Sequence, residues 1–212
     1  MDKRYAIFDM DGTLVDSMGY WRNMEREFLL SRGITEHLDE ILEITKPMTL
    51  EESSAYFSKT CGIDCTPAQL ISEVEAIMAE HYRRDIRLKP GVQEYLERLK
   101  QEGIPMCVAS ATNKPLVELC LNTLGLRPYF RFILSCVEVG AGKNQPDVFL
   151  EAARRLGAEP KDCAVFEDAI YAVRSAHSAG FHVVAVKDAH NASCWEELTQ
   201  LADEIIMDWS QA

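Results

Sequence analysis

The fold is decided by residues 5–17, which read Tyr-Ala-Ile-Phe-Asp-Met-Asp-Gly-Thr-Leu-Val-Asp-Ser. The apolar run at residues 5–8 has the length of a buried parallel strand, and it stops at Asp9 and Asp11, with Gly12 directly after them. A turn near Gly12 can aim one carboxylate and the neighbouring backbone into a crevice. Because open α/β sheets bind ligands at the carboxyl ends of their strands, the stretch predicts a functional site there.

Residues 17–85 carry a different pattern, with predicted helices at 18–30, 37–44, 50–60 and 66–84 and no predicted strand. Thr66 followed by Pro67 is a typical helix N-terminus. A segment of about 70 residues is too long for an ordinary strand-to-strand connection. We therefore expect an inserted all-helical cap domain at 17–85 and a catalytic core formed by residues 1–16 and 86–212.

From residue 87 onward, predicted helices and strands alternate. This pattern is typical of an α/β protein with a doubly wound parallel sheet, similar to the Rossmann fold. The predicted strands are 104–109, 132–135, 163–166, 182–186 and 204–206, and the predicted helices are 90–103, 114–124, 146–156, 169–179 and 194–201.

The composition is that of a globular protein, with 212 residues of which 47% are hydrophobic and 26% charged. A formal net charge of −12 opposes binding to nucleic acid or to an anionic membrane. The N-terminal residues include no apolar signal segment, which predicts a cytoplasmic protein. We also expect the protein to be a monomer or a weak dimer. The seven cysteines suit reduced thiols, and Cys61 and Cys65 lack the second pair that a typical zinc site has.

Three later segments place polar residues near predicted strand ends or helix starts. Ser110 closes one strand, Lys143 lies in a loop flanked by glycines, and Glu167 and Asp168 close another strand. Each has an ordinary explanation by itself, namely a helix cap, a solvated lysine or a favourable contact with a helix dipole. Together with Asp9, however, the adjacent acids predict a site for a divalent cation such as Mg²⁺.

The four segments resemble, in order, the four motifs of the haloacid dehalogenase superfamily. The first is residues 5–17, the second is Val-Ala-Ser-Ala-Thr-Asn at 108–113, the third contains Lys143 and the following Pro146-Asp147, and the fourth begins at 165. Asn144 stands where proline is usual, and Ala169 and Ala172 stand where serine and glycine are usual. These departures leave every charged motif residue in place.

The resemblance implies a phosphatase that acts on a small phosphorylated metabolite through an aspartyl-phosphate intermediate. Asp9 would be the nucleophile and Asp11 the general acid and base, while Ser110 and Lys143 complete the catalytic group. Mg²⁺ would be held by Asp9, Glu167 or Asp168, and the backbone carbonyl of Asp11. The phosphate-binding residues implied are Asp9, Met10, Asp11, Gly12, Ser110, Ala111 and Lys143.

The resemblance also makes the helical insert a lid, with Tyr20, Trp21 and Lys46 of the 46–49 loop as candidate substrate contacts. Trp21 could equally belong to the core of the cap. Three rival functions remain: a dehalogenase, which would need neither Asp11 nor the acid pair; a phosphomutase; and a non-catalytic phosphate-binding protein. Beta-phosphoglucomutase has a histidine twelve residues beyond its nucleophile, where this chain has Trp21, and this difference favours the phosphatase.

Overall fold

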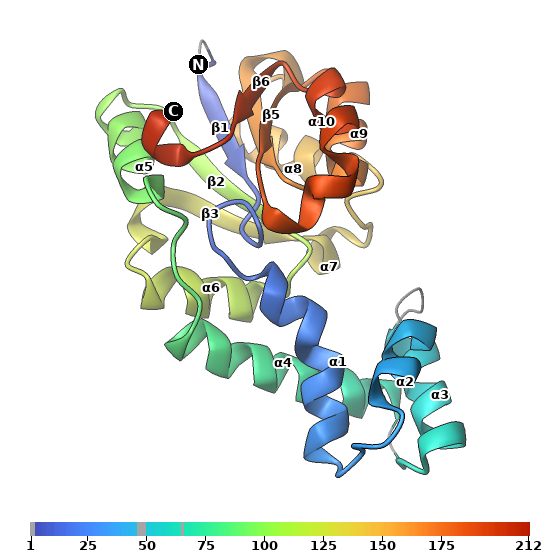
Figure 1. Ribbon diagram of the computed structural model, residues 1–212. Helices are drawn as coiled ribbons and strands as arrows, with labels where there is room; N and C mark the ends of the chain where they lie inside the picture. The colour runs from blue at the N-terminus through green and yellow to red at the C-terminus, as the bar shows by residue number, and fades with distance from the viewer. Residues whose placement is uncertain (1–2, 46–49, 65) are drawn as a thin grey trace. The chain divides into compact units, whose positions relative to one another are not determined.

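The computed structural model describes residues 3–45, 50–64 and 66–212. The chain forms two compact units (Figure 1): unit 1 contains the residues up to Met18 and Ile86–Ala212, and unit 2 is Gly19–Asp85. The predicted insert began two residues earlier, at Ser17. The predictions for Lys46, for the rest of the 46–49 loop and for Cys65 lie outside the described residues.

Unit 1 is built on one sheet of six parallel strands in the order β3-β2-β1-β4-β5-β6. The chain adds strands outward from β1 in one direction and then returns to add them on its other side, so the predicted doubly wound sheet is confirmed. The strands are β1 (Tyr5–Phe8), β2 (Met106–Ser110), β3 (Phe130–Ser135), β4 (Cys163–Glu167), β5 (His182–Val186) and β6 (Glu204–Ile206).

Helices cover both faces of this sheet (Figure 1). They are α5 (Val92–Gln101), α6 (Lys114–Thr123), α7 (Cys136–Val139), α8 (Asp147–Leu156), α9 (Ile170–Ser178) and α10 (Trp195–Leu201), with short 3₁₀ segments at Arg127–Tyr129, Pro160–Asp162, Ala189–Cys194 and Trp209–Gln211. The pleat of β1 sends Ile7 into the core shared with α8 and α9. It sends Phe8 to the other face, where the ring stacks on Phe166 with centroids 4.3 Å apart.

The described part of unit 2 is all helical, with α1 (Met18–Ser31), α2 (Leu38–Thr45), α3 (Leu50–Cys61) and α4 (Pro67–Arg84). Its own apolar core contains Phe28, Phe57 and Leu70. Thr66 caps α4 with a reciprocal pair of hydrogen bonds to Gln69, as the Thr-Pro sequence predicted. Because each unit has its own core, the helical segment has the organisation of an independent domain.

The bounds of the predicted elements lie within two residues of those observed, and the two-residue differences are at α5, β2 and β3. Residues 136–139, for which the sequence predicts no element, form α7, because the Ser135 hydroxyl accepts from the Glu138 amide and caps a single turn. The helix predicted to begin at Cys194 begins at Trp195, after a 3₁₀ segment that Asp188 caps.

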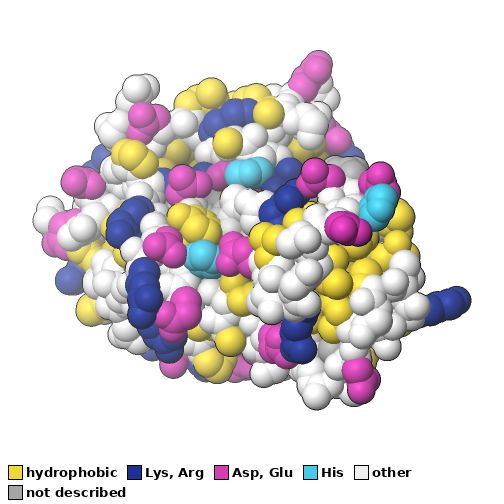
Figure 2. Space-filling model, turned by 60° about the horizontal axis from the view of Figure 1, so that its bottom comes forward, with side chains coloured by type: hydrophobic (Ala, Val, Ile, Leu, Met, Phe, Trp, Pro, Cys, Tyr) yellow, Lys and Arg dark blue, Asp and Glu magenta, His cyan; other side chains and the backbone are white. Residues whose placement is uncertain are grey.

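The face drawn in Figure 2 agrees with the charge pattern of the sequence. Acidic and basic side chains are interspersed on the face drawn in Figure 2, with no large basic area among its described residues. No helix in the described ranges is long and apolar enough to span a membrane.

Candidate active site

The order of the strands brings the first, second and fourth motifs to one edge of the sheet. Strand β1 lies between β2 and β4, and Phe8 is in register with both Val108 and Phe166. Asp9 follows β1, while Ser110 and Glu167 are the last residues of the two neighbouring strands. The carboxyl ends of three adjacent strands therefore present Asp9, Ser110 and Glu167 side by side.

Lys143 reaches the same edge from the loop between α7 and α8. Its ammonium group is an ion-pair partner of Asp9 Oδ1 and lies 2.5 Å from Glu167 Oε1. The Lys143 side chain is only 2% exposed. Burial alone would lower the pKa of Lys143, but the charges of Asp9 and Glu167 outweigh it and raise the pKa above its ordinary value. The lysine therefore stays charged and offsets part of the negative charge of the site.

Asp9, Glu167 and Asp168 form a buried cluster in which each offers a carboxylate oxygen within 4.8 Å of the others. Burial is the largest cause that raises the pKa of Asp9 well above its ordinary value, and Lys143 acts in the opposite direction. Burial, followed by the charge of Glu167, raises the pKa of Asp168 to about 7. Three acids against one lysine leave excess negative charge, which bound protons or a divalent cation can balance.

The two acids of the fourth motif have different partners. Glu167 is occupied at both oxygens, because Lys143 contacts Oε1 and the amides of Asp168 and Ala169 donate to Oε2 at 3.0 and 3.1 Å. Asp168 accepts a hydrogen bond from Thr13 at Oδ1. Despite these different partners, both acids belong to the group of carboxylates that could hold a cation.

Asp11 is held by two hydroxyl groups. Ser17 donates to its Oδ1 at 2.6 Å, and Thr112 donates to its Oδ2 at 2.8 Å. The Thr112 amide also donates to Ser110 Oγ at 3.0 Å. The second motif therefore places Ser110 at the strand end and supplies a hydrogen bond to Asp11. We did not predict a role for Ser17 or Thr112, although both lie within or directly beside the motifs.

Gly12 makes the turn that the sequence required. Its φ of +81° lies in the left-handed region, and a Cβ atom there would collide with the Asp168 carboxylate. The Gly12 amide donates to the Val15 carbonyl at 3.0 Å. Gly12 therefore lets the loop after β1 approach the acid cluster closely.

The candidate substrate residues of unit 2 pack within that unit. The Trp21 indole donates to the buried Tyr82 hydroxyl at 3.1 Å, and the Tyr20 ring lies 4.6 Å from the His81 ring. These contacts show how both side chains are held, and their role toward a substrate stays a prediction.

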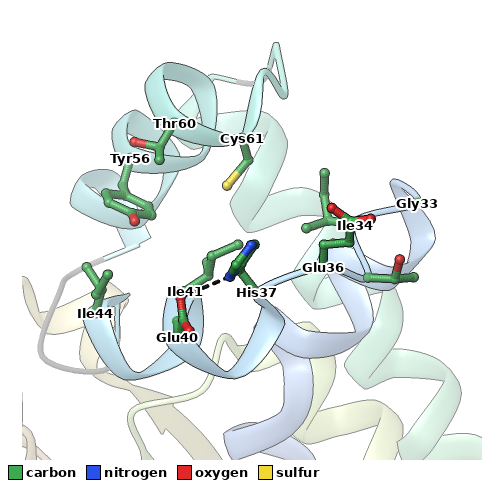
Figure 3. Close-up of a pocket in the computed structure, with 11 residues that line it drawn as sticks. Gly33, Ile34, Glu36, His37, Glu40, Ile41, Ile44, Tyr56, Thr60 and Cys61 are labelled. Atoms are coloured by element: carbon green, nitrogen blue, oxygen red, sulfur yellow. Dashed lines mark hydrogen bonds and ion pairs between the residues drawn. The ribbon is translucent and has the colours of Figure 1, made fainter.

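A separate pocket of about 590 Å³ lies within unit 2, between α2 and α3 (Figure 3). Ile34, Ile41 and Tyr56 line it together with an ion pair between His37 and Glu40 at 3.1 Å. None of the acids of the cluster lines it. The cluster of Asp9, Glu167 and Asp168 belongs to unit 1.

Comparison with known proteins places this arrangement in a family. The family model for haloacid dehalogenase-like hydrolases matches residues 3–180. The fructose-1-phosphate phosphatase YqaB of Escherichia coli is 30% identical over 88% of this chain and 99% of its own length. A bifunctional riboflavin kinase/FMN phosphatase of Arabidopsis thaliana is 29% identical over 95% of this chain, which spans about half (52%) of that protein.

The crystal structure of CbbY from Rhodobacter sphaeroides in complex with phosphate has the same fold, with a TM-score of 0.80. It covers 99% of this chain and 96% of its own, at 23% identity. The family match and the sheet order agree with the four motifs read from the sequence. The chain belongs to the haloacid dehalogenase-like hydrolase family.

Proposed function

We propose that this chain is a Mg²⁺-dependent phosphatase that hydrolyses a small phosphorylated metabolite through an aspartyl-phosphate on Asp9. The observation that carries the proposal is the buried contact of Asp9 with Lys143, next to Glu167 and Asp168, at the end of β1. Relatives named as phosphatases support the same assignment. Their names favour a sugar phosphate or a similar phosphomonoester as the substrate.

Asp9 is the nucleophile in this proposal. Its carboxylate oxygen forms a bond to phosphorus while the bond from phosphorus to the ester oxygen breaks. The Lys143 ammonium stabilises the ionised form of Asp9, which the buried surroundings disfavour. Lys143 is also positioned to balance charge on the phosphoryl oxygens as the transfer proceeds.

Asp11 moves the protons. It donates a proton to the leaving oxygen and later takes one from the water that attacks phosphorus and releases Asp9. Ser17 and Thr112 hold both of its oxygens, so the direction of the carboxyl group is fixed before substrate arrives. The same two hydroxyls can hold the Asp11 side chain in one position during both proton transfers.

The donor set fits a hard divalent cation, because three buried carboxylates converge and oxygen ligands are the kind that Mg²⁺ prefers. In this proposal Asp9 and Asp168 hold the ion with the backbone carbonyl of Asp11, and Glu167 supports them. Bound Mg²⁺ would stabilise the negative charge of the phosphoryl oxygens and help orient the phosphoryl group toward Asp9.

The phosphate itself would contact Ser110, Lys143 and the loop at residues 9–11. Ser110 Oγ accepts from the Thr112 amide, and a hydroxyl that accepts can still donate its own proton to a phosphoryl oxygen. Because the Gly12 amide donates to Val15, we assign Gly12 to the turn rather than to phosphate binding.

A phosphomutase is the second candidate. A mutase returns the phosphoryl group to a sugar, and its cap needs groups that exclude water while coupling to Asp11. Trp21 directs its indole N–H to Tyr82, which favours a place in the cap interior over that coupling. We therefore prefer the phosphatase.

The test is a panel of phosphorylated metabolites, including sugar phosphates, assayed with Mg²⁺ and after exhaustive chelation. Free phosphate and isomerised sugar phosphate are measured together, with a bisphosphate primer present in one arm. We expect free phosphate from at least one ester, and only with Mg²⁺. Isomer formed much faster than phosphate would favour the mutase, and undiminished hydrolysis after chelation would exclude the proposed cation.

A further inference from the structure

Lys89 lies next to the proposed active site, and none of the four motifs contains it. Its ammonium group lies 2.8 Å from Asp188 Oδ2 and donates to the carbonyl of Lys187 at 2.9 Å. It also donates to the carbonyl of Gly12. The Lys89 side chain is 12% exposed, and its three N–H groups match these three acceptors.

These contacts join three segments that are distant in the sequence. Gly12 lies in the loop after β1, Lys187 and Asp188 follow β5, and Lys89 itself precedes α5. The Lys89 amide donates to the Leu14 carbonyl at 3.0 Å, so its backbone is fixed to the same loop as its side chain. Burying a charged group is costly unless it is paired and hydrogen-bonded, and Lys89 meets both conditions.

Two of the three groups that Lys89 holds are linked to Asp168, Gly12 directly and Asp188 through Asn191. Gly12 approaches the Asp168 carboxylate so closely that no side chain fits between them. On the other side, Asn191 donates to the Asp168 carbonyl at 3.1 Å, and its amide oxygen accepts from the Asp188 amide at 3.2 Å. Lys89 therefore fixes the positions of two groups on different sides of Asp168, the Gly12 carbonyl and the Asp188 carboxylate.

We propose that Lys89 is a positioning residue for the divalent-cation site, because it fixes Gly12 and Asp188 and thereby holds the Asp168 carboxylate toward Asp9. This inference rests on the proposed function, in which Asp168 binds the cation. The charge of Lys89 has a supporting effect, since it opposes the rise that burial and Glu167 cause in the pKa of Asp168. Groups that orient metal ligands without contacting the metal themselves typically contribute about 10- to 100-fold to metal affinity.

A purely structural role makes a different prediction. If Lys89 only joined the three segments, its removal would lower the melting temperature equally with and without Mg²⁺. A positioning residue also changes the Mg²⁺ concentration at which the protein is half-saturated. That concentration is the dissociation constant, which is obtained by fitting the rise in melting temperature across a Mg²⁺ titration, without any assay of activity.

The experiment titrates Mg²⁺ against wild type, Lys89→Met and Lys187→Met. Lys187 is the matched control, because its substitution removes the same charge from a neighbouring position while its side chain lies over the Trp195 ring, 4.3 Å from the centroid. We expect half-saturation at about tenfold higher Mg²⁺ for Lys89→Met and at the wild-type concentration for Lys187→Met. Half-saturation of Lys89→Met at the wild-type concentration would overturn the inference.

Asp188→Asn is the second variant, for the case in which Lys89→Met does not fold. It removes the ion pair and leaves Lys89 its two carbonyl contacts, so we expect a smaller shift in the same direction. A folded Asp188→Asn with unchanged half-saturation would then overturn the inference alone. A wild-type protein whose melting temperature does not respond to Mg²⁺ would overturn the proposed cation, and this inference with it.

Discussion

The Thr13 hydroxyl donates to Asp168 Oδ1 at 3.0 Å, which joins the loop after β1 to the end of β4. Both residues are buried, with Thr13 at 0% and Asp168 at 6% exposure. The hydrogen bond favours the ionised form of Asp168, which burial disfavours. The first and fourth motifs are thus coupled through a residue outside the acid cluster.

Removing this hydroxyl should destabilise the protein. Thr13→Val keeps the shape of the side chain but leaves Asp168 with one fewer donor. A hydrogen bond to a charged group contributes about 1.5–3 kcal/mol, and we expect a loss of that order in the free energy of unfolding. Urea denaturation in metal-free buffer measures it.

Thr199→Val is the control for this measurement, because the Thr199 hydroxyl donates to a backbone carbonyl at an exposed position. We expect its free energy of unfolding to change by less than about 0.5 kcal/mol. Equal effects of the two substitutions would show that the Thr13–Asp168 contact has no particular importance.

Lys143→Met should remove activity and also lower stability in metal-free buffer. The substitution leaves Asp9 and Glu167 buried without their cation, a change that typically costs about 3–5 kcal/mol. Lys114→Met is the control, since the Lys114 side chain is 38% exposed and its ion pair with Glu138, at 3.5 Å, is open to solvent. We expect its free energy of unfolding to fall by less than about 1 kcal/mol. Similar denaturation midpoints for both variants would contradict the role of Lys143 in charge balance.

His81 in unit 2 predicts a dependence of stability on pH. Burial lowers the pKa of His81, but hydrogen bonds and charges from Asp85 and Glu27 outweigh it and raise the pKa above 6.5. A raised pKa means that the folded state binds the proton more tightly. The stabilisation is therefore full below pH 6.5 and is lost as the pH rises through the raised value.

The measurement compares wild type with His81→Gln by urea denaturation from about pH 5 to about pH 9. We expect the difference in free energy of unfolding to be largest at the acid end and to shrink as pH rises. His177→Gln, at an exposed position of α9, serves as control. A difference that grows with pH would show that the direction is wrong.

Unit 1 should fold without unit 2. Val15 pairs with Leu88 in an antiparallel bridge, and the Asp16 amide donates to the Arg87 carbonyl at 3.0 Å, so the two ends of the excision lie side by side. A short linker in place of residues 19–85 should give a protein that melts cooperatively and hydrolyses small activated esters, with less discrimination among natural ones. Circular dichroism and a substrate panel test both points, and an unfolded product would make unit 2 part of the main core.

The sequence was sufficient for the sheet and for the residues that carry charge at strand ends. Asp9 and Glu167 each follow an apolar run, and the parallel arrangement brings such positions together whatever the loops do. Lys143 could be found because glycines and the following Pro146-Asp147 identify its loop as a motif.

The supporting contacts could not be predicted in the same way. Lys89 binds backbone carbonyls of Gly12 and Lys187, and a carbonyl gives no signal in a sequence because every residue has one. Thr13 is an ordinary residue of its motif until the fold places it against Asp168. Thr112 likewise stands in its motif with no sign of the hydrogen bond that it donates to Asp11.

The central claim is that Asp9 accepts the phosphoryl group, and the most direct measurement is acid quenching during turnover followed by peptide mass analysis. The account predicts a phosphoryl group on the peptide that contains Asp9 in the wild-type protein, and neither this modification nor turnover in a folded Asp9→Asn variant. An Asp9→Asn protein that releases phosphate at the wild-type rate would contradict it.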